Sequence, residues 1–179
     1  MKEFGELYGL YYKSIYKYLF YLTGDHHLSE DLLQETFFNA FKAIDKFEGR
    51  SKVSTWLYTI AKNAYLKEQN KSKKTDVVLS EEIILEQIDL EMPEAILESR
   101  DSVKAIISAI RRLEENYRQV ILLRSIGELS FRDIGELLNR NENWARITFY
   151  RAKLKLKQEM ESNQYLFSKD SMKNTGGKR

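Results

Sequence analysis

Hydrophobic residues recur every three or four positions along most of this chain, which is the spacing of amphipathic helices. Three such segments cover residues 4–23, 29–47 and 55–71. We expect the second helix to begin at an N-cap, Ser29, and the third at Ser54, because a short hydroxyl side chain can accept from the first free backbone N–H groups. The first half of the chain is therefore predicted to be a small three-helix bundle.

In the second predicted helix the apolar and the polar positions lie on opposite sides. The apolar stripe is Leu33, Phe37, Ala40, Phe41 and Ile44. The polar side, which we expect to face solvent or a partner, carries Asp31, Gln34, Glu35, Asn39 and Lys42.

A second series of helical patterns covers residues 93–112, 115–125, 130–138 and 143–160. Ser130 is a predicted N-cap with an acidic residue in the first turn behind it. The short segment 130–138, the tight polar turn 139–142 and the basic segment after it have the lengths of a helix-turn-helix, whose second helix enters the DNA major groove.

Charge divides the chain between these two helical groups. Residues 76–98 contain eight Asp or Glu and no Lys or Arg, whereas the flanking segments 1–75 and 101–162 are each basic by three charges. We therefore predict an all-α protein with helical domains at 1–75 and 99–162, a flexible acidic linker at 76–98 and a disordered basic tail at 163–179. The linker has two interpretations, a solvated connector or a segment that avoids or imitates a phosphate backbone.

Composition narrows the function further. The 179 residues include no Cys, which excludes disulfides, thiolate metal sites and cysteine nucleophiles. No stretch approaches 18 consecutive apolar residues and no leader pattern opens the chain, so we expect a soluble cytoplasmic protein. His26 and His27 are neighbours on a predicted loop and are not expected to chelate one ion. No phosphate-binding loop, nucleophile elbow or cofactor motif is found, so we expect neither catalysis nor a small-molecule substrate.

Two segments carry the side chains that nucleic-acid binding requires. A projection of the last helix at 100° per residue places Ala145, Phe149, Ala152 and Leu156 on a core side. The outer side and its flanks carry groups suited to guanine, adenine, thymine methyl or phosphate contacts: Asn143, Trp144, Arg146, Ile147, Tyr150, Arg151, Lys153, Lys155 and Lys157. An ordinary basic surface helix is the other interpretation.

The third helix combines aromatic and basic residues, as proteins that bind single strands do. Trp56, Tyr58 and Tyr65 could stack on bases, with Lys62 and Asn63 nearby. The other interpretation is that these aromatic residues pack inside the bundle.

Three motifs, in this order, resemble the extracytoplasmic-function class of the sigma-70 family, the bacterial transcription initiation factors. Residues 29–37, SEDLLQETF, resemble region 2.2, and residues 47–63, FEGRSKVSTWLYTIAKN, are similar to regions 2.3 and 2.4. Residues 113–153, from LEENYRQVILLR to RAK, resemble region 4. The chain departs from the family pattern at residues 143–145, where Gly-Thr-Val is common, and at Thr148, where a basic residue is common.

The resemblance implies roles for particular residues. Asp31, Gln34 and Glu35 would bind core RNA polymerase. A loop and the helix behind it would bind the opened minus-10 promoter strand through Phe47, Gly49, Arg50, Ser51, Lys52, Trp56, Lys62, Asn63 and Lys67. The final helix would read the minus-35 duplex through Asn143, Trp144, Arg146, Ile147, Tyr150, Arg151 and Lys153. The resemblance also implies an anti-sigma factor as a partner, of a kind that is commonly membrane-anchored.

Two alternatives to a sigma factor follow from the same residues. A stand-alone helix-turn-helix repressor or activator would bind its operator tightly without polymerase. A DNA-processing enzyme with a helix-turn-helix would need clustered carboxylates or a positioned nucleophile, and the sequence offers neither.

Overall fold

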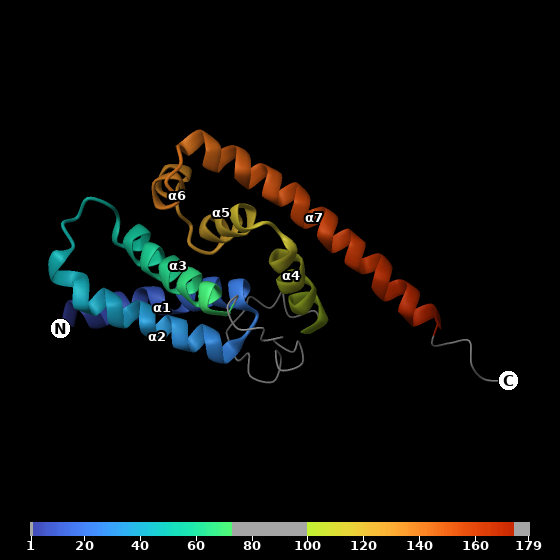
Figure 1. Ribbon diagram of the computed structural model, residues 1–179, viewed down its shortest axis with the longest axis horizontal. Coiled ribbons are helices and arrows are strands. Elements are labelled where there is room, and N and C mark those ends of the chain that lie inside the picture. The colour runs from blue at the N-terminus through green and yellow to red at the C-terminus, as the bar shows by residue number, and fades with distance from the viewer. Residues whose placement is uncertain (1, 73–99, 174–179) are drawn as a thin grey trace.

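The computed structural model describes residues 2–72 and 100–173, and within them all regular elements are helices (Figure 1). The first stretch forms α1 (Lys2–Thr23), α2 (His26–Ala43), a 3₁₀ turn η1 (Ile44–Lys46) and α3 (Val53–Ser72). The second forms α4 (Arg100–Arg112), α5 (Glu115–Ser125), α6 (Phe131–Leu137) and α7 (Glu142–Lys173). The prediction of an all-α protein with two helical groups is confirmed. The predicted linker, residues 76–98, lies outside the described residues.

Helices α2 and α3 begin earlier than the sequence pattern predicts. Asp25 caps α2, because its Oδ1 accepts from the backbone N–H of Leu28 at 3.0 Å. Ser29 is buried inside the helix, with its Oγ 2.8 Å from Oγ1 of Thr23, so its predicted N-cap role is wrong. The adjacent histidines consequently lie in the first turn of α2 rather than on a loop. Ser54 likewise lies inside α3, which begins at Val53.

The helix-turn-helix begins where the sequence predicts. Ser130 caps α6 in a reciprocal capping box, in which its Oγ accepts from the N–H of Asp133 at 3.1 Å. The turn that follows ends at Asn141, whose Oδ1 accepts from the N–H of Trp144 at 2.8 Å. Asn141 therefore caps the first turn of α7.

Helix α7 is longer than predicted. It continues to Lys173, so a disordered tail from residue 163 is wrong for residues 163–173, while 174–179 lie outside the described residues. No Gly or Pro interrupts its sequence. Nζ of Lys157 lies 3.8 Å from Oε1 of Glu161, and opposite charges four residues apart stabilise a helix.

The two helical groups pack against each other. Helix α1 contacts α4 and α5, and α3 contacts α6 (Figure 1). One continuous core therefore contains residues of both groups, with Tyr18 and Tyr58 on one side and Ile110 and Leu123 on the other. Inside this core the Tyr18 hydroxyl donates to Oε1 of Gln119, and both side chains are almost completely buried.

Gly127 allows the loop after α5 to approach α3 closely. A Cβ at this position would lie 2.7 Å from the carbonyl oxygen of Leu123 and 3.0 Å from Cζ of Tyr58. Since real Cβ atoms are not found this close to backbone atoms, the loop between α5 and α6 can rest on α3 only because this residue has no side chain.

Candidate polymerase and nucleic-acid interfaces

The outer side of α2 combines acidic, amide and aromatic side chains. Asp31 and Gln34 are exposed, as predicted, and Glu35 is half-buried. Phe38 and Phe41 are 61% and 49% exposed, although Phe41 was expected in the buried stripe. Steps of about 100° per residue place these five residues on one side of the helix. That projection is also the signal from which an exposed Phe38 could have been found.

Glu35 also reaches across to α3. Its Oε1 lies 2.7 Å from Nζ of Lys67, and the hydrogen bond and charge of Glu35 raise the pKa of that lysine. A residue predicted to bind polymerase is thus the ion-pair partner of a residue predicted to bind promoter DNA. Sequence reasoning did not find this link, because the two residues are on different helices.

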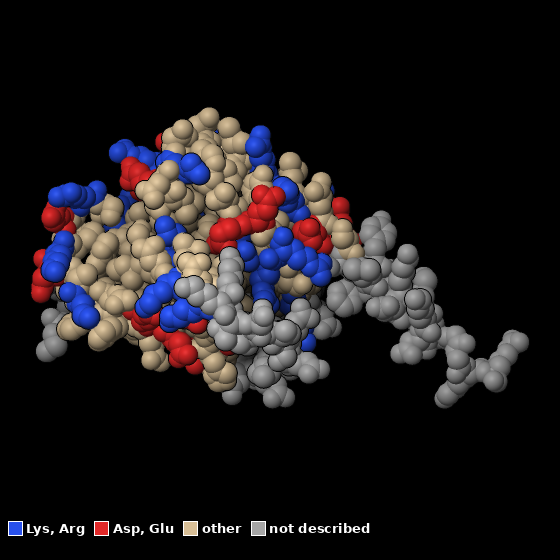
Figure 2. Space-filling view, in the orientation of Figure 1, with Lys and Arg blue, Asp and Glu red and all other residues tan. Residues whose placement is uncertain are grey.

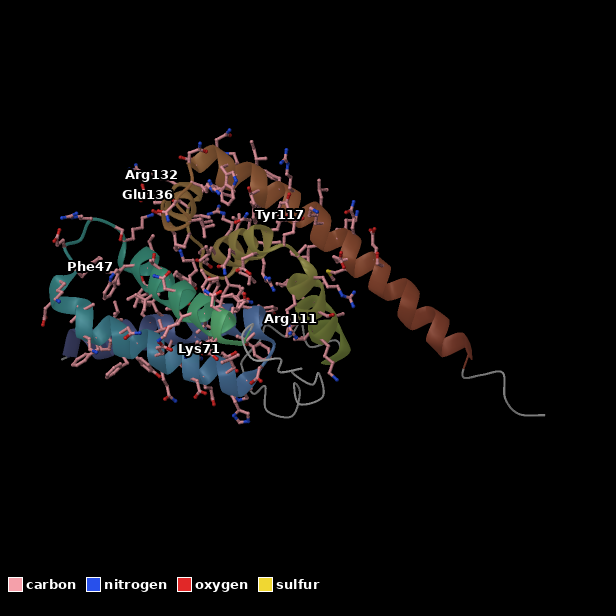
Figure 3. The ribbon with its side chains drawn as sticks, in the orientation of Figure 1. Phe47, Lys71, Arg111, Tyr117, Arg132 and Glu136 are labelled. Carbon is pink, nitrogen blue, oxygen red and sulfur yellow. The ribbon has the colours of Figure 1, made fainter. Side chains whose placement is uncertain are left out.

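The loop between η1 and α3 is open to solvent at its centre. Gly49 has a φ of +68° with open space around its Cα, and Arg50 pairs with its neighbour Glu48. At the base of the loop the ring of Phe47 lies against Trp56, with centroids 4.9 Å apart (Figure 3). Ser51 is half-buried. The loop thus presents an exposed arginine at its centre and an aromatic pair at its base.

Two of the predicted minus-10 lysines contact helix α6. Nζ of Lys52 lies 3.0 Å from Oδ2 of Asp133, and Nζ of Lys62 donates to the carbonyl oxygen of Leu137 at 3.1 Å. Partial burial lowers the pKa of Lys62. For Asp133 burial alone would raise the pKa, but hydrogen bonds from Ser130 and Lys52 hold it below its ordinary value. Helix α6 is therefore held by a lysine near each end.

The aromatic residues of α3 divide between the core and the surface. Tyr58 and Tyr65 are buried, so the packing interpretation is correct for them. Trp56 is half-buried, whereas Asn63 and Lys67 are exposed. Only the exposed side chains and the Trp56 edge can meet a nucleic acid without rearrangement.

The predicted reading face of α7 is exposed along its length. Ile147 and Tyr150 are 42% and 57% exposed, and Asn143, Arg151 and Lys153 are also exposed, while Trp144 is half-buried. On the opposite side Ala145 and Ala152 are completely buried. Thr148 is buried too, so at this position the chain has no basic group at the surface.

Neighbouring side chains hold several cations of this region. Nη2 of Arg146 lies 2.6 Å from Oε1 of Glu142, and its Cζ lies 5.0 Å from the ring centroid of Phe131. Arg140 lies over the ring of Trp144 at 5.7 Å. On the face drawn in Figure 2, Lys and Arg alternate with Asp and Glu rather than forming one continuous basic surface. The positive charge on this face is therefore divided into small separate groups.

The described residues contain no group of three or more His, Cys, Asp or Glu placed to hold a metal ion. In the same part of the chain, no helix is long and apolar enough to cross a membrane.

The sequence matches known families over both helical groups. Residues 7–75 match the family described as sigma-70 region 2, and residues 104–156 match the one described as sigma-70, region 4. Over 154 residues the chain is 33% identical to the ECF RNA polymerase sigma factor SigM of Bacillus subtilis, which covers 85% of this chain and 91% of SigM. The chain belongs to the extracytoplasmic-function class of the sigma-70 family. The resemblance seen in the three motifs is thereby confirmed.

Other similar proteins agree with this assignment. SigW of Bacillus subtilis is 32% identical over 166 residues, covering 88% of each chain. Among solved structures, the sigma factor RpoE of Bartonella quintana, in complex with the anti-sigma factor NepR, has a TM-score of 0.73 at 20% identity, over 90% of this chain and 98% of that one. CnrH in complex with the cytosolic domain of CnrY has a TM-score of 0.67 at 20% identity, over 90% and 89%. These two likenesses establish that the fold is shared.

Proposed function

We propose that this sigma factor binds core RNA polymerase through α2, reads the opened minus-10 strand through the loop before α3 and α3 itself, and reads the minus-35 duplex through α7. One observation carries the proposal: both sigma-70 regions match in order, and each contains an exposed face at the predicted positions. In this division residues 1–75 and 99–162 are the two functional domains, and residues 76–98 are the acidic connection.

The polymerase face is supported by its mixture of side chains. Exposed Asp31 and Gln34 lie beside Phe38 and Phe41, and aromatic residues at the centre of a polar rim are typical of protein–protein interfaces. Large apolar side chains that remain this exposed in a folded helix favour a partner.

Minus-10 reading is assigned to exposed side chains that can stack on or hydrogen-bond to a separated base. Asn63 offers an amide for a base edge, and Trp56 an aromatic surface. Arg50 and Lys67 supply charge for the phosphates. A base held outside the duplex has to be unpaired first, at a cost of a few kcal/mol, and polymerase is expected to supply the contacts that offset it.

Minus-35 reading is assigned to Arg146, Ile147, Tyr150 and Arg151, with Asn143 and Trp144 before them and Lys153 behind. An arginine in the major groove can bind a guanine edge in bidentate fashion, and Ile147 can contact a thymine methyl. This face is exposed although the two helical groups are packed against each other, and its exposure supports the assignment.

The similar structure of RpoE is a complex with the anti-sigma factor NepR, and that of CnrH is a complex with the cytosolic domain of CnrY. We therefore expect a protein of that kind to control this chain in the cytoplasm. As a family of transcription regulators, sigma factors carry no catalytic step of their own, and we propose the same here.

The deciding experiment is in vitro transcription from a promoter library with purified core polymerase. We expect initiation at defined promoters only when both proteins are present. Arg146→Ala should weaken discrimination at the minus-35 element on duplex DNA, and Asn63→Ala should weaken minus-10 discrimination even on a pre-opened template. Tight promoter binding by the chain alone, with no effect of added polymerase, would instead favour the repressor.

A further inference from the structure

Two aromatic rings lie directly beneath the predicted reading face of α7. The rings of Phe131, at the start of α6, and Phe149, on α7, have centroids 5.5 Å apart at an angle of 56°. Both side chains are half-buried. Neither residue was expected to take part in DNA binding, and both contact cations that face the surface.

Phe131 meets two guanidinium groups. Cζ of Arg124 lies 4.9 Å and Cζ of Arg146 lies 5.0 Å from its ring centroid, within the range of cation–π attraction. Arg124 is fixed by a second contact, because its Nη1 donates to the carbonyl oxygen of Leu129 at 2.8 Å. Arg146 is exposed and is the only one of these two arginines on the predicted reading face.

Arg146 is restrained from a second direction as well. Its Nη2 lies 2.6 Å from Glu142, one turn earlier on α7. A guanidinium has five N–H donors in a rigid plane, so one contact to a carboxylate leaves donors for a base edge. Ring and carboxylate together restrict the orientation of that plane before DNA arrives.

We infer that Phe131 is a positioning residue that holds Arg146 in the orientation with which it reads the minus-35 element. The inference rests on the proposed role of Arg146 in minus-35 reading. A long flexible arginine loses conformational freedom when it binds one base pair, and a side chain that is already ordered loses less. Base discrimination by Arg146 should therefore depend on the negative face of the Phe131 ring, although Phe131 is not one of the predicted DNA-binding residues.

Graded fluorination of Phe131 tests this directly, because each added fluorine weakens the negative face of the ring while its shape changes little. The full chain carrying these analogues is combined with core polymerase, and affinities are measured for promoters with every base at each minus-35 position. We expect discrimination to fall stepwise with fluorination, by about two- to five-fold in total. The loss should occur at the same base positions that Arg146→Ala affects.

Substitutions provide the matched controls. Phe131→Leu should reduce discrimination as the fluorinated series does, and Phe131→Tyr should retain it. In an Arg146→Ala background, Phe131→Leu should cause no further loss of discrimination. Tyr117→Leu removes a similar contact, because Nζ of Lys155 on α7 lies 5.1 Å from the ring centroid of Tyr117, the residue labelled on α5 in Figure 3. Lys155 is expected at most to contact a phosphate, which carries no base specificity. Tyr117→Leu should therefore leave base discrimination unchanged.

The outcomes distinguish a failure of this inference from a failure of the proposed minus-35 role of Arg146. If Arg146→Ala leaves every minus-35 preference intact, the proposed reading role of Arg146 is refuted. If Arg146→Ala removes a preference but the fluorinated proteins keep it, the positioning role of Phe131 is refuted. A uniform loss of affinity for all sequences, or a further loss in the double variant, would show that Phe131 only supports the fold. Since the fluorinated ring fills the same space, the series remains decisive even if Phe131→Leu unfolds.

Discussion

The buried hydrogen bond between Tyr18 and Gln119 makes a quantitative prediction about how the two helical groups are joined. These residues are 101 positions apart, and their side chains are 0% and 3% exposed. Replacement of Gln119 by Leu puts an apolar side chain of similar size in place of the amide and leaves the tyrosine hydroxyl without this acceptor. An unsatisfied buried polar group costs about 1–3 kcal/mol. For a chain of this length each kcal/mol lowers the melting temperature by about 2–4 °C.

The measurement is urea and thermal unfolding of the full chain, followed by circular dichroism, in a double-mutant cycle. Gln119→Leu should lose about 1–3 kcal/mol. Tyr18→Phe removes the hydroxyl itself, so the double variant should recover most of the loss, because replacing both partners by apolar groups can be nearly neutral. Gln119→Leu also removes a bond from Nε2 to Glu115 at 2.6 Å, and this loss stays in the double variant.

Two results would refute this reasoning. The first is a free energy of unfolding for Gln119→Leu within about 0.5 kcal/mol of that of the unmodified chain, as for a surface substitution. The second is a double variant in which the losses of the two single variants simply add, which is the behaviour of independent sites. Either result would mean that this bond does not join the helical groups in solution.

Three further predictions concern single contacts. Glu35→Lys should weaken core polymerase binding in a pull-down assay with little change in stability. The control Glu6→Lys, at an exposed position of α1, should bind polymerase as the unmodified chain does. Equal binding by both variants would remove Glu35 from the polymerase face. Gly127→Ala should cost about 1–3 kcal/mol in urea unfolding through overlap with Leu123 and Tyr58, whereas Gly9→Ala, with open space around it in α1, should be neutral or stabilising. Because the pKa of Asp133 is lowered in the folded state, its charge stabilises the protein above about pH 4, and this contribution is lost as the pH falls through the folded pKa. Asp133→Asn should therefore be less stable at pH 7, by a difference that shrinks as the pH falls through the folded pKa of Asp133, and a difference that stays constant with pH would contradict the assignment.

The helices could be predicted from the sequence because their signals are local. Apolar spacing located the body of each helix in the described residues, and Ser130 marked the start of α6 correctly. Helices α2 and α7 begin three residues and one residue before the predicted positions 29 and 143, because Asp25 and Asn141 accept the first free N–H groups. Several polar residues close together in sequence can cap a helix, and only the backbone geometry selects one.

Contacts between distant residues gave no signal in the sequence. Lys52 and Asp133 are 81 positions apart, and nothing in the spacing of either indicates the other. The same is true of Arg146 over Phe131, which depends on how α6 and α7 cross. Residue type and helical face predicted which side chains could meet DNA, but not which of them already have partners within the protein.

The two predicted DNA surfaces differ in whether their side chains already have partners within the protein. On α7, Ile147, Tyr150 and Arg151 are exposed while the helical groups are packed together, so duplex DNA can approach them without rearrangement. On the other surface, the half-buried ammonium of Lys62 is hydrogen-bonded to the end of α6, and Lys52 is paired with Asp133. A phosphate that bound either ammonium group would have to take the place of its acceptor on α6, the carbonyl oxygen of Leu137 or the carboxylate of Asp133. If these two lysines bind the minus-10 strand as proposed, they must first leave their acceptors on α6, whereas the side chains proposed for minus-35 reading are already open to solvent.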